Sequence, residues 1–350
     1  MKKLPVLNGQ CYYFEDRLNR RYCSGIDIAE GYFIYSGASV YLTDARYFSA
    51  AKVKLKKAGI TALEYKSADD LGREVKKQNI KTVFIDFSKT TLSRYEKLKE
   101  LFCGVEIKDS SDLMLNLRLI KTDDEIKNIK KACKISEKAV KETFACAKEG
   151  ITEKELLKIL EDKMFSLGAD CMAFDSIVAF GKNSAVPHHE TGKTKLKAGD
   201  AVLIDTGCTV SGYCSDITRT AFFGKPDKEF LKVYNAVLSA NVKAEKEIYA
   251  GMTGKAADKI ARDELVKAGY GKYFTHSLGH GVGLLIHENP RLSPKSDDIL
   301  EKNTVFTIEP GVYIDGKFGV RIEDTCLMTA AGAKRLFTGS KKLRIIPQNK

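Results

Sequence analysis

The sequence has 350 residues, of which 43% are hydrophobic and 30% are charged. This length predicts about two globular domains, and the hydrophobic content is sufficient for each to have a core. The net charge is +12, but the lysines alternate with acidic residues in helical segments such as 121–142, as on solvated helix faces. No apolar stretch approaches the roughly 20 residues of a membrane span. We therefore expect neither a nucleic-acid partner nor a membrane partner.

The nine cysteines are scattered along the chain and form no Cys-x-x-Cys motif. This distribution fits a reducing compartment and argues against a disulfide framework or a zinc–cysteine site. Residues 1–17 have no apolar core and no small-residue cleavage site, so they do not resemble a signal peptide. Together these observations predict a cytoplasmic protein.

The first 120 residues alternate between strand-like and helix-like segments, the pattern of a small α/β domain. No residue cluster in this part suggests chemistry. The predicted strands lie within 31–44, 60–67, 81–88 and 103–114, and the predicted helices are 45–59, 69–80 and 93–102.

A domain boundary is predicted near residues 118–122, which gives one domain over 1–120 and another over 122–350. Capping-box patterns begin two helices after this boundary. Two more helices separate two hairpin-like regions, so the order helix–helix–hairpin occurs twice and suggests an internal duplication. The four predicted helices are about 123–148, 152–167, 227–249 and 254–268.

Four acidic residues in the second half form two pairs, each placed about a predicted β-turn. Asp205 and Asp216 lie symmetrically about residues 210 and 211, and Glu309 and Glu323 lie symmetrically about an Asp-Gly-Lys turn. Residues symmetric about a hairpin turn face each other, with Cβ atoms roughly 5 Å apart. Like charges in that position repel. We therefore predict that cations hold these carboxylates apart.

All the histidines also lie in this half, which suggests a shared pocket. His280 stands between two glycines that permit close backbone approach, so we predict that it is a metal ligand. Cys208 and Cys214 are predicted to be small core or loop residues, because thiolates suit softer metals than carboxylates do. The five histidines are His188, His189, His276, His280 and His287.

Strand alternation places Arg321 on the face of Glu323, and Tyr313 and Thr307 on the face of Glu309. We expect Arg321 to orient and partly neutralise a ligand carboxylate. Four carboxylates and one imidazole would balance two divalent cations, with Mn²⁺ favoured over Zn²⁺ and with Co²⁺ and Fe²⁺ also compatible. Such a pair activates water for hydrolysis at a carbonyl or phosphoryl centre. The sequence has no phosphate-cradling motif, which favours a carbonyl substrate.

Several blocks of the sequence resemble the metal-site blocks of the pita-bread metallopeptidases, in particular the Xaa-Pro aminopeptidase and Xaa-Pro dipeptidase group. Residues 1–120 resemble the creatinase-type N-terminal domain. The resemblance covers the whole chain and implies an α/β (α+β) fold, with a pita-bread catalytic domain after that N-terminal domain. The blocks are DTGCTVSGYCSDITRTAFF, HSLGHGVGLLIHENP, IEPGVYI and GVRIEDT.

The resemblance implies a role for each site residue. Asp205 would hold one metal ion, and His280 with Glu309 would hold the other, while Asp216 and Glu323 would bridge both. Glu309 would also act as general base and proton shuttle during attack on the carbonyl before proline. The remaining roles are stabilisation of the tetrahedral intermediate by His287, substrate positioning by His188, a proline pocket lined by Phe174 and His188, and support from His276, Tyr313 and Arg321.

We therefore expect hydrolysis of the bond before proline in short peptides with proline at the second position. One alternative is a strict Xaa-Pro dipeptidase, in which Arg291 would bind the free carboxylate of a dipeptide. Another is a catalytically inactive peptide-binding module, against which the five intact ligand positions argue. The resemblance also implies a homodimer in which the N-terminal domain approaches the partner's site.

Overall fold

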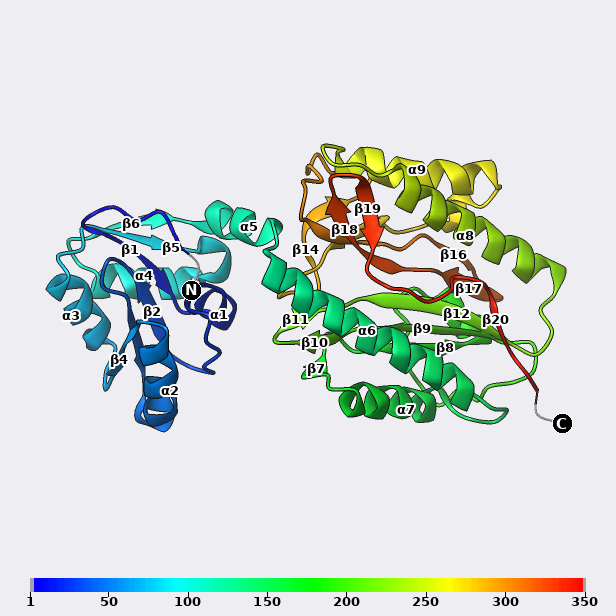
Figure 1. Ribbon diagram of the computed structural model, residues 1–350, viewed down its shortest axis with the longest axis horizontal. Coiled ribbons are helices and arrows are strands. Elements are labelled where there is room, and N and C mark those ends of the chain that lie inside the picture. Colours follow the sequence, from blue (N-terminus) through cyan, green and yellow to red (C-terminus); the bar gives the residue numbers. More distant parts are fainter. Residues whose placement is uncertain (1–2, 349–350) are drawn as a thin grey trace. The chain divides into compact units, whose positions relative to one another are not determined.

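The protein is described by a computed structural model that covers residues 3–348. The chain divides into two compact units, Met1–Leu117 and Arg118–Lys350 (Figure 1). Helix α5 (Ser111–Leu119) crosses this division, which lies beside the boundary predicted from the sequence. Each unit has its own hydrophobic core.

The N-terminal unit is built on a mixed sheet with strand order β4-β3-β2-β1-β5-β6. Strands β1, β5 and β6 run parallel, and β2 is antiparallel to β1. Its strands are β1 (Gln10–Phe14), β2 (Tyr32–Tyr35), β3 (Val40–Thr43), β4 (Thr61–Glu64), β5 (Thr82–Ile85) and β6 (Glu106–Asp109). Its helices are α1 (Arg17–Ser24), α2 (Ala45–Lys57), α3 (Asp69–Lys77), α4 (Leu92–Leu101) and the 3-10 turn η1 (Phe87–Lys89).

The strands and helices predicted between residues 31 and 102 are confirmed, whereas β1 and α1 were not predicted. The prediction of a strand over 103–114 is wrong in its second half. There the chain forms β6 and then enters α5. The side chain of Asp109 accepts a hydrogen bond from the backbone N–H of Ser111, and the leucine-rich segment that follows has high helix propensity.

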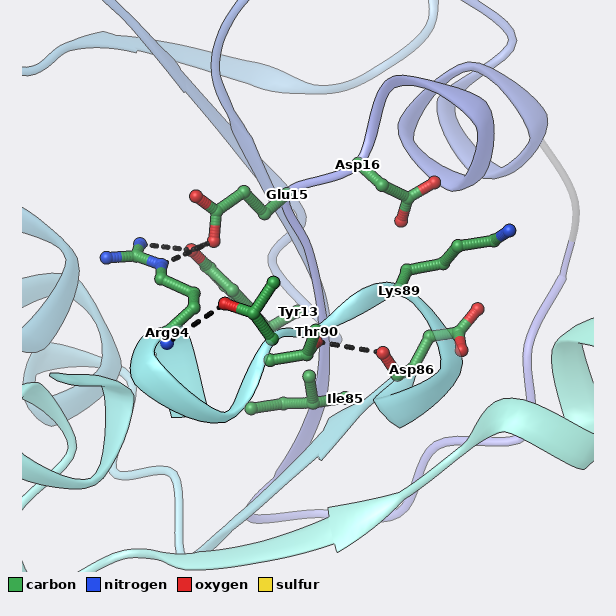
Figure 2. A pocket seen from close by; sticks show the side chains of 9 residues that line it. Tyr13, Glu15, Asp16, Ile85, Asp86, Lys89, Thr90 and Arg94 are labelled. Atoms are coloured by element: carbon green, nitrogen blue, oxygen red, sulfur yellow. Dashed lines mark hydrogen bonds and ion pairs between the residues drawn. The ribbon is translucent and has the colours of Figure 1, made fainter. Parts of the chain in front are cut away.

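A pocket of about 340 Å³ opens at the carboxyl ends of β1 and β5 in this unit (Figure 2). Each of its acidic side chains accepts a hydrogen bond from a donor of the same unit. Arg94 donates to Glu15 at 2.7 Å and to the hydroxyl of Tyr13 at 3.1 Å. Asp86 accepts from the amide of Asn19 at 2.7 Å. These pairings explain why polar residues line the pocket without forming a reactive cluster.

In the second unit the strands lie between two helix pairs (Figure 1). Helices α6 and α7 pack against one core, and helices α8 and α9 pack against the other. The four helices predicted here are confirmed to within three residues at each end. They are α6 (Asp123–Cys146), α7 (Glu153–Ser166), α8 (Lys228–Glu247) and α9 (Gly254–Lys267).

The predicted capping boxes are present and fix where α6 and α7 begin. At the second one, Thr152 accepts from the N–H of Glu155 at 3.2 Å, and Glu155 accepts from the N–H of Thr152 at 2.8 Å. Each such cap contributes about 1 kcal/mol. The apolar face of α6, including Ile129, Cys133 and Val140, is buried.

The strands of this unit form several small sheets, with orders β20-β12-β9-β8, β14-β13-β15-β18-β19, β11-β10-β7 and β16-β17. The predicted order of helix pair then hairpin occurs twice along the chain. The first strands are β7 (Cys171–Met172), β8 (Ile177–Phe180), β9 (Ala201–Thr206), β10 (Cys208–Val210), β11 (Tyr213–Cys214) and β12 (Ile217–Phe223). Next come β13 (Gly279–Gly281), β14 (Glu288–Leu292), β15 (Val305–Ile308), β16 (Gly311–Ile314), β17 (Phe318–Arg321), β18 (Asp324–Thr329), β19 (Gly332–Arg335) and β20 (Arg344–Ile346), with 3-10 turns η2 (Gly181–Ala185) and η3 (Gly271–Tyr273).

Candidate metal centre

The aspartate pair, Asp205 and Asp216, lies on one hairpin, but the register of that hairpin differs from the one predicted. Ser211 and Gly212 form its two-residue turn, with positive φ angles of 49° and 76°. The turn centre is therefore one residue later than expected, and Asp205 is opposite Thr218 rather than Asp216. A shift of the centre by one residue moves each partner by two, so both aspartates stay on the same face as diagonal neighbours.

The glutamate pair lies symmetrically about its turn, as predicted. In the β16–β17 hairpin, Gly311 pairs with Arg321 across a turn with Gly316 at φ 70°. The β15–β18 ladder continues the same register, with Ile308 opposite Asp324. Glu309 and Glu323 occupy the two breaks between these ladders. Glu309 and Glu323 are therefore opposite each other across the two chain segments.

His280 on β13 brings the two acid pairs together. Its Nε2 lies 3.5 Å from Oδ2 of Asp216 and 3.4 Å from Oε1 of Glu309. One ligand atom from each of Asp216, His280 and Glu323 lies within 4.8 Å of the others. Asp216 and Glu323 are only 4% and 2% exposed. Acids so deeply buried and so close together need compensating positive charge.

Hydroxyl groups hold two of these carboxylates in place. Thr218 donates to Glu323 at 2.7 Å, and Thr307 donates to Glu309 at 3.3 Å. The hydroxyl of Thr307 also accepts from the backbone N–H of His280 at 3.1 Å. Threonines at these strand positions thus fix the orientation of the candidate ligands.

Arg321 is buried at the centre, but its partner differs from the one expected. It donates from Nη2 to Oδ2 of Asp205 at 2.6 Å, and not to Glu323, with which it shares a strand face. It also donates to Tyr313 at 2.7 Å, and the Tyr313 hydroxyl lies 2.9 Å from Nε2 of His276. The prediction that Arg321 orients a ligand carboxylate stays a prediction, with Asp205 as the carboxylate it contacts.

Burial and mutual repulsion shift the titration of the acids. Burial, followed by the charges of Glu323, Asp205 and Glu309, raises the pKa of Asp216 well above its usual value. Burial is also the main cause that raises the pKa of Glu323 well above its usual value and that of Glu309 to about 8. Burial lowers the pKa of His280 to about 4. Without metal, burial therefore favours the protonated form of these three acids and the neutral form of the imidazole.

The donor set fits two divalent cations. Oδ1 of Asp205 is buried without a hydrogen-bond partner among the described residues, although Oδ2 of the same group is bound to Arg321. A buried acceptor left without a donor is costly, and a cation would satisfy it. Oxygen ligands with one imidazole suit hard or borderline ions. The neutral state of His280 leaves a ring nitrogen free to coordinate.

The other histidines do not all share this pocket. The ring of His287 meets that of His280 edge to face, with centroids 4.3 Å apart. Burial lowers the pKa of both His276 and His287, and the nearby His188 contributes a smaller lowering to each. His189 instead lies 3.0 Å from the carboxylate of Glu153, an acid that is not part of the cluster. The expectation of one pocket for all five is wrong for His189.

Glu153 was not singled out from the sequence. It is fully buried in the first turn of α7 and accepts from the N–H groups of Phe180 and Gly192, both at 2.9 Å. It therefore holds both ends of the loop that carries His188. Acidic residues are common in the first turn of a helix, where they interact favourably with the helix dipole. The sequence therefore carries no sign that Glu153 is buried.

Phe174 and Arg291 each lie beside a residue of the segments that carry the candidate ligands. The ring of Phe174 stands so close to Gly207 that a Cβ there would meet it at 3.0 Å. Arg291 is directly opposite His280 in the β13–β14 ladder, and its side chain is exposed. Cys208 and Cys214 are buried, and burial raises the pKa of both thiols, as expected for core cysteines.

Two family models match the chain. Residues 127–330 match metallopeptidase family M24, and residues 7–120 match the creatinase/prolidase N-terminal domain. The chain belongs to metallopeptidase family M24. The expected fold is thereby confirmed as a creatinase-type N-terminal α/β domain followed by a pita-bread catalytic domain, and the chain is a metallopeptidase.

Relatives of both expected kinds are similar to it. The Xaa-Pro dipeptidase of Pyrococcus furiosus is 40% identical over 93% of this chain and 92% of its own. The structure of an X-Pro aminopeptidase from Thermotoga maritima has a TM-score of 0.92 at 35% identity, covering 96% of this chain and 97% of its own. That of an Xaa-Pro dipeptidase from Bacillus anthracis has a TM-score of 0.91 at 37% identity, covering 96% and 94%.

Among the described residues, no helix combines the length and the apolar character that crossing a bilayer requires.

Proposed function

We propose that the protein is an Xaa-Pro aminopeptidase, which hydrolyses the bond before proline and releases the N-terminal residue of a peptide. The observation that carries this proposal is the buried cluster of Asp216, Glu309 and Glu323 around His280. Such a cluster needs cations to be charged at neutral pH, and cations there confer hydrolytic chemistry. The similarity to X-Pro aminopeptidase and Xaa-Pro dipeptidase relatives supports proline specificity.

In this proposal Asp205 would hold one divalent ion, His280 and Glu309 would hold the other, and Asp216 and Glu323 would contribute to both. The oxygen-rich set favours Mn²⁺, with Co²⁺, Zn²⁺ and Fe²⁺ also compatible. When bound, the ions supply Lewis acidity and activation of a water molecule.

Glu309 is the proposed general base. Its Oε1 and Oε2 face His280 and His276, at 3.4 and 4.0 Å, so the carboxylate sits inside the cluster and not on its rim. A carboxylate in this position can take the proton of the attacking water and pass it to the departing proline nitrogen. Thr307 keeps the group oriented.

His287 and His188 are proposed to act on the substrate. His287 packs against His280, and burial lowers its pKa, so a neutral ring can donate a hydrogen bond to the oxygen that becomes negative. His188 is exposed on the loop held by Glu153, where it can position the substrate. The ring of Phe174, beside Gly207, would form the apolar wall of the proline pocket.

A strict Xaa-Pro dipeptidase is the second candidate, and one observation favours it. Arg291 directly opposes His280 across two paired strands, so the two side chains share a face. Among the described residues, the Arg291 side chain has no hydrogen-bond or ion-pair partner. A free guanidinium on the strand next to His280 could bind the carboxylate of a dipeptide bidentately.

We also propose that the enzyme works in the cytoplasm as a homodimer. The nine free cysteines support a reducing compartment. Sedimentation analysis of the purified protein tests the dimer, and a monomer at micromolar concentration would contradict it.

The deciding experiment is an assay of the Mn²⁺-reconstituted protein on Ala-Pro and Ala-Pro-Ala. Cleavage of both, or of the tripeptide alone, supports an aminopeptidase. Cleavage of the dipeptide alone identifies a dipeptidase and gives Arg291 a binding role. If neither peptide is cleaved by protein shown to contain two metal ions, the peptidase proposal is wrong and a peptide-binding role replaces it.

A further inference from the structure

A network of buried polar side chains contacts the backbone beside the glutamate pair. Helix α8 contributes Asn241, and strands β12 and β18 contribute Arg219 and Asp324. The C-terminal segment before β20 contributes Lys341. Asn241 and Asp324 are fully buried, and Arg219 is 9% exposed. Polar groups buried this deeply in a core of apolar residues require a specific reason.

Asn241 bonds to the backbone next to both candidate glutamate ligands. Its Nδ2 donates to the carbonyl of Ile308 at 2.9 Å and to the carbonyl of Ile322 at 3.0 Å. Ile308 immediately precedes Glu309, and Ile322 immediately precedes Glu323. Ile308 is the last paired residue of the β15–β18 ladder, and Ile322 lies in the gap between that ladder and the β16–β17 ladder.

Lys341 and Asp324 extend the contact to the other side of Glu323. Nζ of Lys341 donates to Oδ1 of Asn241 at 2.6 Å and lies 3.0 Å from Oδ2 of Asp324. Asp324 is the residue that follows Glu323. Its Oδ1 accepts from Arg219 at 2.6 Å, and Arg219 also donates to the backbone carbonyl of Glu323. The backbone on both sides of Glu323 is thus bound to one connected network.

Only an amide side chain fits the position of Asn241. Two carbonyl oxygens require donors on one side, and an ammonium group requires an acceptor on the other. An aspartate of the same shape would keep the contact with Lys341 but present an oxygen to two carbonyl oxygens. A leucine would leave both carbonyls without this donor and would remove one acceptor from Lys341, whose Nζ would keep its contacts with Glu245 and Asp324.

We propose that Asn241 is a positioning residue that fixes the separation of the Glu309 and Glu323 carboxylates, and that Lys341 and Asp324 hold Asn241 in that role. The inference rests on the proposed function only in taking these glutamates as metal ligands. Groups that orient metal ligands commonly affect metal affinity by about 10–100-fold when they are replaced. Asn241 touches no ligand side chain, so its influence passes entirely through the backbone.

The test is the affinity and stoichiometry of Mn²⁺ binding to the full chain, measured by titration calorimetry without substrate. Asn241→Asp is expected to weaken binding about 10–100-fold while its circular dichroism spectrum stays that of the parent. Asn235→Asp makes the same chemical change at an exposed position of the same helix and is expected to leave the affinity unchanged. Lys341→Met is the second variant, with a smaller loss expected, about tenfold.

Equal Mn²⁺ affinity in the parent, Asn241→Asp and Lys341→Met proteins would overturn the proposal, even if their unfolding temperatures differed. If Asn241→Asp does not fold, Lys341→Met alone decides in the same way. The outcome is separate from that of the peptidase assay. A parent protein that binds two ions but cleaves no Xaa-Pro peptide would contradict the proposed function and leave the positioning role intact.

Discussion

Each unit of this chain gathers acidic side chains at one place, and the two clusters differ in how their charge is compensated. In the pocket of the N-terminal unit, Glu15 is bound by Arg94 (Figure 2), and Asp86 accepts from Asn19. Asp16 caps α1 by accepting from a backbone N–H at 2.8 Å. Every acid there has a donor supplied by its own unit.

In the second unit, the four acids of the candidate metal centre have one arginine among them. Arg321 binds Asp205, while Asp216, Glu309 and Glu323 face one another and a neutral imidazole. Burial is the largest cause of the raised pKa of each of these three carboxyl groups, and the charge of neighbouring acids, including Asp205, adds to it. A cluster of acids therefore indicates a cation site when the protein leaves its charge uncompensated, and a structural role when local donors compensate it.

The largest effect is expected at the point where the uncompensated acids meet. Replacing His280 with alanine removes the nitrogen that lies between Asp216 and Glu309. Metal-dependent activity should fall by more than about a hundredfold, which is the upper end of the loss seen for residues that only support a ligand. The unfolding temperature of the metal-free protein should stay near that of the parent. Full activity in this variant would show that the cluster is not the catalytic site.

The two units also differ in their arginines. Arg94 of the N-terminal pocket is bound to Glu15, whereas the Arg291 side chain of the second unit is exposed. If the enzyme is a dipeptidase, Arg291→Ala should raise KM for Ala-Pro about tenfold or more, the loss of a charged hydrogen bond. KM for Ala-Pro-Ala should change far less. Steady-state kinetics on both peptides measure the split, and equal effects would exclude Arg291 as a carboxylate anchor.

The pKa of Glu309, about 8 in the folded metal-free protein, predicts a pH-dependent stability. Between about pH 4.5, where the unfolded carboxyl titrates, and pH 8, the folded state holds a proton that the unfolded state has released. The metal-free parent should therefore lose stability as pH rises through this window. Glu309→Gln does not titrate and should lose less. Urea midpoints with a chelator at pH 5, 7 and 9 give the slopes, and parallel slopes would contradict the assignment.

The smallest effect is expected in the compensated cluster. Glu15→Gln makes the same acid-to-amide change, but it removes a partly exposed ion pair with Arg94. Such pairs contribute about 1 kcal/mol or less, so unfolding by urea should change little. Mn²⁺ affinity should not change at all. A large loss of metal binding here would mean that the two clusters are not independent.

Much of this site could be predicted from the sequence, because hairpin symmetry is local. The Asp-Gly-Lys turn fixed the register of Glu309 and Glu323 correctly. For Asp205 and Asp216 the turn residues are Ser211 and Gly212, one residue later than predicted. The predicted partner of Asp205 was therefore wrong, but the prediction that both aspartates lie on one face of the hairpin was correct.

What could not be predicted were contacts between segments far apart in the chain. Strand parity correctly grouped Arg321 with the site, but its binding to Asp205 joins residues 116 positions apart. The link between His189 and Glu153 and the bonds from Asn241 to Ile308 and Ile322 depend likewise on how helices pack on the sheets. Periodicity and turn chemistry carry no information on such contacts.

The central claim, that the buried acids of the second unit form a two-ion site, is tested most directly by calorimetric titration of Mn²⁺ into chelator-stripped protein at pH 7. Comparing two buffers with different ionisation enthalpies also reports proton release. We predict two bound ions and release of protons, because the raised pKa of Glu309 means that metal displaces protons from the cluster. Absence of saturable binding, or binding without proton release, would contradict the account.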